Sequence, residues 1–247
     1  MSEMPFNERL IPSGLGDTPQ HLEELLQLEN HPNKIIRIYP LDVVEQTYHM
    51  PAEEALKNGK RLFEELNTNY NISTKADFVI GKDKEDRKVV YIITDRIEGE
   101  SLHHIVDKSE SDEIKKIEGD VHNMYISLIK YYTDKIQSGD YFLDDIAILH
   151  QYVYGKKTGE LEEKIYMVDT DISFNKDKAS IYEAVWELTR QMKRFEKRLN
   201  TKFDDVRNMI KEFLNVHYVI NSNDRPENEI MEDIEESRRK IESMLSR

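Results

Sequence analysis

Cysteine is absent from this 247-residue sequence, which excludes disulfide bonds and thiolate metal sites. Long apolar runs are absent as well, and none approaches the roughly 20 residues that a membrane-spanning helix needs. The first residues, MSEMPFNERL, lack the apolar stretch of a signal peptide. We therefore expect a cytoplasmic protein with no membrane partner.

Positive charge is scarce relative to negative charge. The chain has 35 lysines and arginines against 49 aspartates and glutamates, a net charge of -14 at pH 7. This excess repels a phosphate backbone, so we expect no nucleic-acid partner. With 38% apolar and 34% charged residues, the composition is that of a soluble globular protein. The length suits one large domain or two small lobes around a cleft.

The sequence changes character at Lys88–Leu102, KVVYIITDRIEGESL. Val89–Ile93 is an apolar run rich in β-branched residues, which predicts a strand buried on both faces. Glu98–Gly99–Glu100 predicts a turn. Short strands and one helix are expected before this stretch, and mostly helices after it. It would therefore connect a β-rich lobe, residues 1–97, to a mainly helical lobe, residues 98–247.

The first lobe is predicted to contain two hairpins and one helix. Turn residues at Asn30–Asn33 lead into a strand over Lys34–Tyr39, and the arm before the turn fits a strand or a helical turn equally well. The second hairpin joins Phe78–Gly81 to the strand at Lys88–Thr94. A helix is predicted over Ala52–Asn67, because Pro51 before it suits a first turn.

Helices dominate the second lobe, because apolar residues recur there every three or four positions. The predicted helices cover Asp112–Gln137, Ile181–Leu199, Phe203–His217 and Glu229–Leu245. Between the first and second of them, an apolar strand over Ile146–Gly155 and a returning strand over Lys164–Val168 are predicted to form a hairpin.

Acidic residues flank this predicted hairpin at its entry and its exit. They are Asp140, Asp144, Asp145, Asp169 and Asp171. An antiparallel hairpin returns to its starting end, so these side chains should lie close together. Carboxylates gathered without an evident cationic partner repel one another, and Mg²⁺ commonly bridges such oxygens to substrate phosphates. The alternative is that they are ordinary loop residues in an acidic chain.

Several stretches resemble the protein-kinase-like phosphotransferases, in particular the aminoglycoside and choline kinase type. YIITDRIEGESL is similar to the hinge of that family, and Ser138–Ile146 is similar to its catalytic loop. IYMVDTD is similar to the strand that ends in the metal-binding aspartate. IIRIYP resembles the strand of the phosphate-pairing lysine, with Arg37 at that place. The resemblance covers roughly residues 10–175.

The resemblance implies an α+β, bilobal kinase-like fold, with a small antiparallel β-sheet lobe carrying one helix and a larger, mainly helical lobe. It implies ATP and Mg²⁺ as cofactors, with a nucleotide and a small-molecule acceptor as partners. Asp140 would be the catalytic aspartate that accepts a proton from the acceptor hydroxyl. The implied metal ligands are Asp145, Asp169 and Asp171. The implied nucleotide contacts are Gly14 and Gly16, Arg37, its helical partner Glu54 (or Glu53 or Glu64), and the backbone of Thr94, Asp95, Arg96 and Ile97.

Three residues depart from the family pattern: Arg37 replaces the lysine, Ser138 the histidine and Asp145 the asparagine. Arginine keeps the positive charge, and aspartate keeps an oxygen ligand. Gly14 and Gly16 fit an ordinary turn as well as a phosphate-binding loop. The protein is then either an ATP-dependent phosphotransferase acting on a hydroxyl of an unidentified acceptor, or an inactive kinase-like protein.

An inactive protein of this kind would be a nucleotide-binding or protein-interaction module. Its partner surface would be the C-terminal helices, with Trp186 and Phe195 as anchors if they are exposed. Core packing is the alternative for both, because they lie on or beside an apolar stripe. A purely helical scaffold, in which the strand predictions are wrong, is the third possibility.

Overall fold

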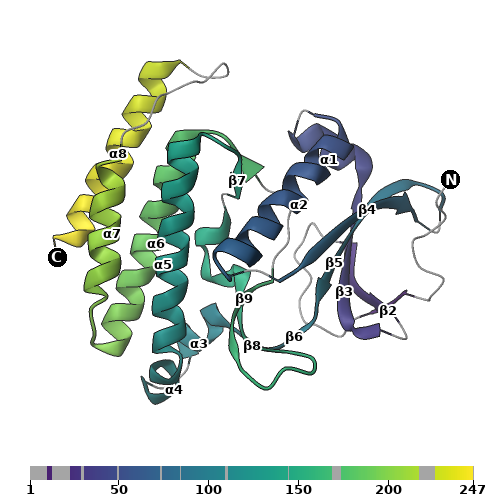
Figure 1. Ribbon diagram of the computed structural model, residues 1–247, viewed down its shortest axis with the longest axis horizontal. Coiled ribbons are helices and arrows are strands. Elements are labelled where there is room, and N and C mark those ends of the chain that lie inside the picture. Colours follow the sequence, from purple (N-terminus) through teal and green to yellow (C-terminus); the bar gives the residue numbers. More distant parts are fainter. Residues whose placement is uncertain are drawn as a thin grey trace.

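The fold is seen in a computed structural model, which describes residues 10–12, 23–28, 31–48, 50–72, 74–83, 85–108, 111–143, 145–168, 174–216 and 226–246. A twisted antiparallel sheet forms one side of the molecule, and a bundle of helices forms the other (Figure 1). The predicted α+β class, with a small antiparallel sheet lobe and a larger, mainly helical lobe, is confirmed. Among the described helices, none is long and apolar enough to cross a membrane.

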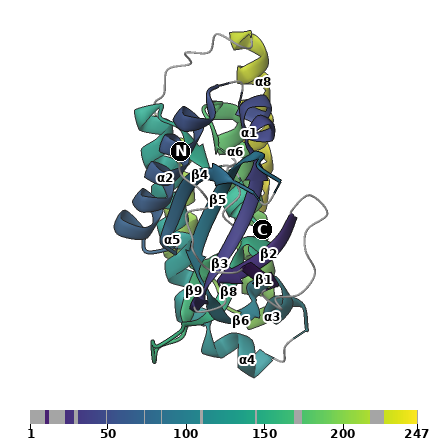
Figure 2. The same cartoon turned by 90° about the vertical axis from the view of Figure 1, so that its right-hand side faces the viewer.

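The first sheet has five strands in the order β1-β2-β3-β5-β4. They are β1 (Leu10–Pro12), β2 (Glu23–Leu28), β3 (His31–Pro40), β4 (Ala76–Lys82) and β5 (Lys88–Asp95). Both predicted hairpins are present, and the arm before the first turn is a strand. As Figure 2 shows, β5 lies between β3 and β4.

The strand β5 is buried on both faces, as its composition predicts. Val90 and Ile92 pack into the main core, whereas Val89 and Tyr91 pack with Ile36 into a small cluster on the other face. A strand covered on both faces needs no polar alternation, which explains the continuous apolar run.

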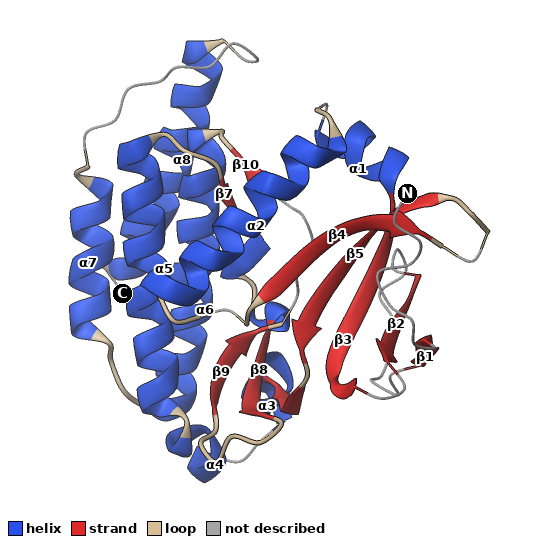
Figure 3. Cartoon of the chain, turned by 45° about the vertical axis from the view of Figure 1, so that its right-hand side comes forward, coloured by secondary structure: helices blue, strands red, loops and turns tan. Residues whose placement is uncertain are grey.

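Two helices accompany this sheet, where one was predicted: α1 (Leu41–Tyr48) and α2 (Ala52–Asn69). The carbonyl of Pro51 accepts hydrogen bonds from the N–H groups of Glu54 and Ala55, which begins α2. Phe63 on α2 contacts Phe78 on β4, with ring centroids 5.7 Å apart. The helix α2 thus lies between the sheet and the helical lobe (Figure 3).

The chain crosses between lobes at Arg96 and then forms the strand β6 (Ile97–Ser101). The turn predicted at Glu98–Gly99–Glu100 is therefore wrong. Strand β6 pairs with β8 (Tyr152–Lys157), which pairs with β9 (Lys164–Met167). Gly99 lies directly opposite Gly155, where the two backbones approach more closely than side chains allow.

The helical lobe contains α3 (Leu102–Lys108), α4 (Ser111–Lys116), α5 (Glu118–Ser138), α6 (Lys178–Leu199), α7 (Asp204–Leu214) and α8 (Glu227–Leu245). The helix predicted over Asp112–Gln137 is interrupted at Ile117, whose backbone leaves helical geometry. The end of α5 at Gly139 is as predicted, because this residue adopts the left-handed conformation with φ 66°.

The strand predicted over Ile146–Gly155 begins only at Tyr152. Before it lie two short 3₁₀ turns, η1 (Asp145–Ala147) and η2 (Leu149–Gln151). The Tyr152 hydroxyl donates to the carbonyl of Ile146 at 2.5 Å, which holds the first turn. Ile146, Ala147 and Leu149 are buried within these turns, and an apolar run alone does not distinguish such turns from a buried strand.

Phe195 and Trp186, which were predicted to be either exposed anchors or core residues, both pack against the core of the helical lobe. Phe195 is fully buried and contacts Tyr125 edge to face, so it is not an exposed anchor. Trp186 is partly buried against the same core, and the Lys240 ammonium lies 5.2 Å from its ring centroid. Core packing was therefore the correct alternative for Phe195.

The close approach of Gly99 and Gly155 makes a testable prediction. A Cβ atom on Gly99 would lie 2.2 Å from the carbonyl oxygen of Tyr154, and backbone atoms cannot move aside without separating β6 from β8. We expect Gly99→Ala to lower the free energy of unfolding by about 3 kcal/mol, measured by urea unfolding.

Gly119→Ala is the matched control, because Gly119 is exposed on α5 and a Cβ there meets nothing within 4 Å. It should leave stability unchanged or raise it by up to about 1 kcal/mol. Equal stability of the Gly99 variant and the wild type would contradict the close approach.

Candidate functional site

A buried arginine connects the sheet lobe to the strand that precedes the predicted metal aspartate. Arg37 lies in the middle of β3 with 8% of its surface exposed, and its Nη1 donates to the carbonyl of Val168 at 3.0 Å. Val168 follows β9 directly, and Asp169 comes next in the sequence. The contact therefore brings the predicted phosphate-pairing cation to the end of the predicted metal-binding strand.

Gln151 also contacts Val168, although it was not among the predicted site residues. Its carbonyl accepts a hydrogen bond from the N–H of Val168 at 2.9 Å. Its side-chain Oε1 is buried and has no hydrogen-bond partner among the described residues. Such an oxygen costs about 1–3 kcal/mol when left unpaired, so it is a candidate acceptor for a donor or a cation.

Asp145 begins the η1 turn and has an exposed side chain. It follows the short strand β7 (Phe142–Leu143), which pairs with β10 (Phe174–Asn175) so that Leu143 faces Phe174. The chain leaving Leu143 and the chain arriving at Phe174 consequently lie at the same end of this pair.

The rest of the predicted carboxylate cluster cannot be placed. Asp144, Asp169 and Asp171 lie outside the described residues, as do Gly14 and Gly16. Within the described ranges, no group of three or more histidine, aspartate and glutamate residues could hold a metal ion. The metal roles of Asp145, Asp169 and Asp171 therefore stay predictions.

Asp140 has cationic partners that the sequence did not reveal. Its carboxylate accepts two hydrogen bonds from the Arg61 guanidinium, at 2.5 and 2.9 Å, and one from the N–H of Tyr141 at 2.7 Å. Lys135 Nζ lies 3.6 Å away. Partial burial acts to raise the pKa of Asp140, but these donors and charges outweigh it and lower the pKa.

The expectation of carboxylates without a cationic partner is thus wrong for Asp140. Arg61 comes from α2 and lies 79 residues away in the sequence, so no local pattern could pair the two. Lys135 offered a signal, because it occupies the apolar face of α5 and is 3% exposed. A lysine at such a position needs a carboxylate nearby.

The residues predicted to bind the adenine base lie where the chain crosses between the lobes. Thr94 is buried and paired with strands on both sides, and the N–H of Arg96 donates to the carbonyl of Asn33 at 2.8 Å. Ile97 pairs with Lys157 on β8. The N–H of Arg96 thus already has a partner within the protein, and the role of this stretch in binding a base stays a prediction.

Asp95 in the same stretch is held by lysines from both lobes. Lys34 on β3 donates to it at 2.6 Å, and Lys157 on β8 lies 3.4 Å away. Burial acts to raise the pKa of Asp95, but the hydrogen bond and charge of Lys34, together with Lys157, lower it.

The glutamate predicted to pair with Arg37 lies on the exposed side of α2. Glu54 is exposed in the first turn of α2, and no ion pair between it and Arg37 is found among the described residues. Glu53 and Glu64 are exposed as well. Glu65 is the α2 glutamate that reaches a buried cation, with its Oε2 2.6 Å from Lys135 Nζ.

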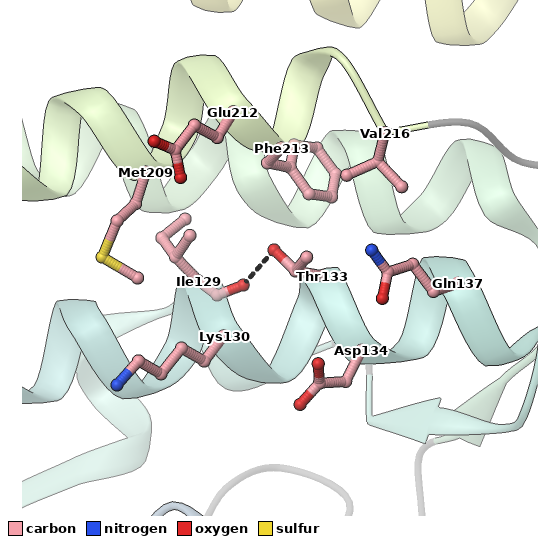
Figure 4. Close-up of a pocket in the computed structure, with 9 residues that line it drawn as sticks. All are labelled: Ile129, Lys130, Thr133, Asp134, Gln137, Met209, Glu212, Phe213 and Val216. Carbon is pink, nitrogen blue, oxygen red and sulfur yellow. Dashed lines mark hydrogen bonds between the residues drawn. The ribbon is translucent and has the colours of Figure 1, made fainter.

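A hollow of about 320 Å³ lies elsewhere, between α5 and α7 (Figure 4). Met209, Phe213 and Ile129 form its apolar part, while Lys130 and Asp134 line its rim. None of the predicted site residues lines it.

No protein-family model matches this sequence, and no curated protein matches it. Among solved structures, the chain is similar to the MAP kinase LmaMPK10 from Leishmania major. The two share 11% sequence identity with a TM-score of 0.40, over 97% of this chain and 81% of that chain. At that TM-score the likeness carries no residue role from that protein to this one.

The charge balance at Asp95 predicts a pH-dependent contribution to stability. Because its pKa is lowered in the folded state, the carboxylate stabilises the protein at pH values above its unfolded pKa of about 3.9. This contribution is lost as the pH falls through the folded pKa. Asp95→Asn should lower the free energy of unfolding by about 1 kcal/mol at pH 7, with a difference that disappears in acid.

Asp77→Asn is the matched control, because the Asp77 side chain is 70% exposed and lies 3.7 Å from Lys60, which is 46% exposed. Urea unfolding between pH 2.5 and 7 measures both variants. If Asp95→Asn lowers the free energy of unfolding at pH 7 no more than Asp77→Asn does, Lys34 and Lys157 do not stabilise the protein through Asp95.

Proposed function

We propose that this protein is an ATP-dependent phosphotransferase of kinase-like fold that transfers a phosphoryl group to a hydroxyl of an acceptor molecule. The contact of Arg37 with Val168 is the observation that carries this proposal. It joins the sheet lobe to the end of β9, 131 residues away in the sequence, at the point where the predicted metal aspartate follows. Chemistry of this class depends on bringing a cation and metal-binding carboxylates to the same phosphates.

The donor set around Val168 fits Mg²⁺. The buried, unpaired Oε1 of Gln151 is a hard oxygen donor next to the strand that leads to Asp169, and Mg²⁺ prefers such oxygens. Asp169 and Gln151 would hold the ion, with Asp145 and Asp171 as the other predicted ligands. Mg²⁺ bound there would neutralise charge on the phosphates of ATP.

Arg37 would bind phosphate oxygens through its guanidinium. Arginine presents paired N–H groups that match phosphate geometry, and burial strengthens their attraction by excluding water. The bond to Val168 uses Nη1 and fixes the orientation of the group. The backbone of Thr94–Ile97 and the loop of Gly14 and Gly16 would supply the remaining nucleotide contacts.

The acceptor would be a neutral or cationic small molecule, because the net charge of -14 disfavours an anionic one. Acceptor preference in a fold of this kind lies in the site and not in the architecture. The helical lobe would therefore supply the acceptor contacts.

A non-catalytic nucleotide-binding protein is the second candidate, and one observation favours it. Glu54 is exposed in the first turn of α2, and no ion pair between it and Arg37 is found among the described residues. Nucleotide binding without turnover would support this reading, whereas turnover that Asp169→Ala abolishes would support the phosphotransferase.

The phosphate role of Arg37 can be separated from base binding. Mg²⁺–ATP and adenosine should each raise the Tm of the wild type. Arg37→Met should weaken ATP binding by about 10–100-fold, because a charged hydrogen bond contributes about 1.5–3 kcal/mol. Adenosine binding should be unchanged. Titration calorimetry and thermal shift measure both ligands.

Two further variants control for folding and for charge. Arg37→Lys retains the positive charge and should keep part of the ATP affinity. Arg87→Met removes an exposed arginine of the β4–β5 hairpin that pairs with Asp83, and it should leave ATP and adenosine binding unchanged. If Mg²⁺–ATP does not raise the Tm of the wild type, the proposed function is wrong.

A further inference from the structure

The end of β9, in the helical lobe, is bonded to the sheet lobe at two consecutive residues. The N–H of Met167 donates to the carbonyl of Ile72 at 2.9 Å, and the carbonyl of Val168 accepts from Arg37 at 3.0 Å. Ile72 follows α2 and Arg37 lies on β3, and these two residues are 4% and 8% exposed. A movement of one lobe relative to the other would therefore break two buried hydrogen bonds at once, which is costly.

Ion pairs join α2 to the end of α5. Arg61 on α2 donates twice to Asp140, which lies just beyond α5, at 2.5 and 2.9 Å. The ammonium of Lys135 on α5 lies 2.6 Å from Glu65 on α2 and 3.6 Å from Asp140. Arg61, Glu65, Lys135 and Asp140 are called the α2–α5 network below. Each α2 residue of this network is bonded to a residue of the helical lobe.

Burial makes the centre of this network strong. The side chain of Lys135 is 3% exposed and that of Glu65 is 20% exposed. Salt screens such a pair little, and separating its members would leave a buried charge without compensation. The network therefore opposes any movement that takes α2 away from α5.

The network and the bond to β9 belong to the same stretch of chain. Tyr70 directly follows α2, and its hydroxyl donates to Asp134 on α5 at 2.5 Å. Two residues later, the carbonyl of Ile72 accepts from Met167. Movement of α2 away from α5 would consequently pull Ile72 away from β9.

We infer that the α2–α5 network fixes the sheet lobe on the helical lobe before any ligand binds, so that a nucleotide enters a preformed site and the lobes do not close on it. The part that concerns the nucleotide rests on the proposed function. The bonds that join the lobes are made within the chain, so a ligand is not needed to form them. Arg37 is then held beside the end of β9 in advance, and no binding free energy is lost in ordering it.

Two adjacent amides report on the lobes separately. The N–H of Met167 is bonded across the lobes, whereas the N–H of Val168 is bonded to the carbonyl of Gln151 within the helical lobe at 2.9 Å. Hydrogen exchange of both amides is measured by NMR on the full-length protein. Separation of the lobes exposes the first amide and leaves the second bonded.

The double variant Arg61→Gln/Glu65→Gln removes both α2 charges of the network and keeps the net charge. Lys135 retains Asp140 at 3.6 Å, so its charge is not left alone and the protein should fold. Exchange of the Met167 N–H should become at least about 10-fold faster than in the wild type. Exchange of the Val168 N–H should stay nearly the same.

Arg87→Gln/Glu85→Gln is the matched control. It makes the same changes of charge in the β4–β5 hairpin, where the two side chains lie 3.4 Å apart and are 58% and 59% exposed. Both exchange rates should stay as in the wild type. Tyr70→Phe, which removes one hydroxyl, should accelerate Met167 exchange by a smaller factor and tests the same contact with a smaller change.

Unchanged Met167 exchange in Arg61→Gln/Glu65→Gln would overturn the inference. Equal acceleration of both amides would overturn it as well, because that result indicates a general loss of stability and not a separation of the lobes.

Mg²⁺–ATP tests the preformed site in the wild type. Binding stabilises the protein as a whole, but it should not slow Met167 exchange relative to Val168 exchange. If it does, the lobes close on the nucleotide, and the preformed site is wrong while the proposed function stands. If Mg²⁺–ATP does not bind, the proposed function fails, and exchange without nucleotide still decides whether the network fixes the lobes.

Discussion

The buried ammonium group of Lys135 is the constraint on which the arrangement of the two lobes depends. It is 3% exposed, and a charge removed from water at that depth is tolerated only beside carboxylates. Glu65 supplies one from α2, and Asp140 supplies the other. Separating α2 from α5 would leave this charge buried and unpaired. The helix α2, which packs on the sheet, is therefore also held to the helical lobe, so it joins the two lobes.

The position of α2 determines which of its side chains face α5 and which face solvent. Its apolar residues pack on the sheet and in the core. Its charged residues Arg61 and Glu65 bond to Asp140 and Lys135, at the end of α5. Its first-turn glutamates consequently face solvent, and Arg37 finds its hydrogen-bond acceptor in the backbone of Val168. The guanidinium of Arg37 is thus oriented by the strand that leads to Asp169, the predicted metal ligand.

Features set by local sequence could be predicted, and features set by distant partners could not. The buried strand at Val89–Ile92 and the end of α5 at Gly139 follow from short patterns of apolar residues and glycine. Strand β6 was mistaken for a turn because Gly99 is explained only by Gly155, 56 positions later. The site shows the same division. Asp145 and Arg37 could be proposed from motifs, but the pairing of Asp140 with Arg61 depends on how two helices pack.

Two sets of ion pairs join the lobes, and they differ in exposure. Lys34, Asp95 and Lys157 lie at the chain crossing, where Asp95 and Lys157 are each 22% exposed. Arg61 and Asp140 lie on the α2 side and are 43% and 35% exposed. Exposed pairs contribute less than shielded ones, so the pair of Arg61 and Asp140 contributes less than the pairs at the crossing. The α2 side is held mainly by the pair of Lys135 and Glu65, whose side chains are 3% and 20% exposed. The lobes are therefore fixed to each other at two places, by Lys135 beside α2 and by Asp95 at the crossing.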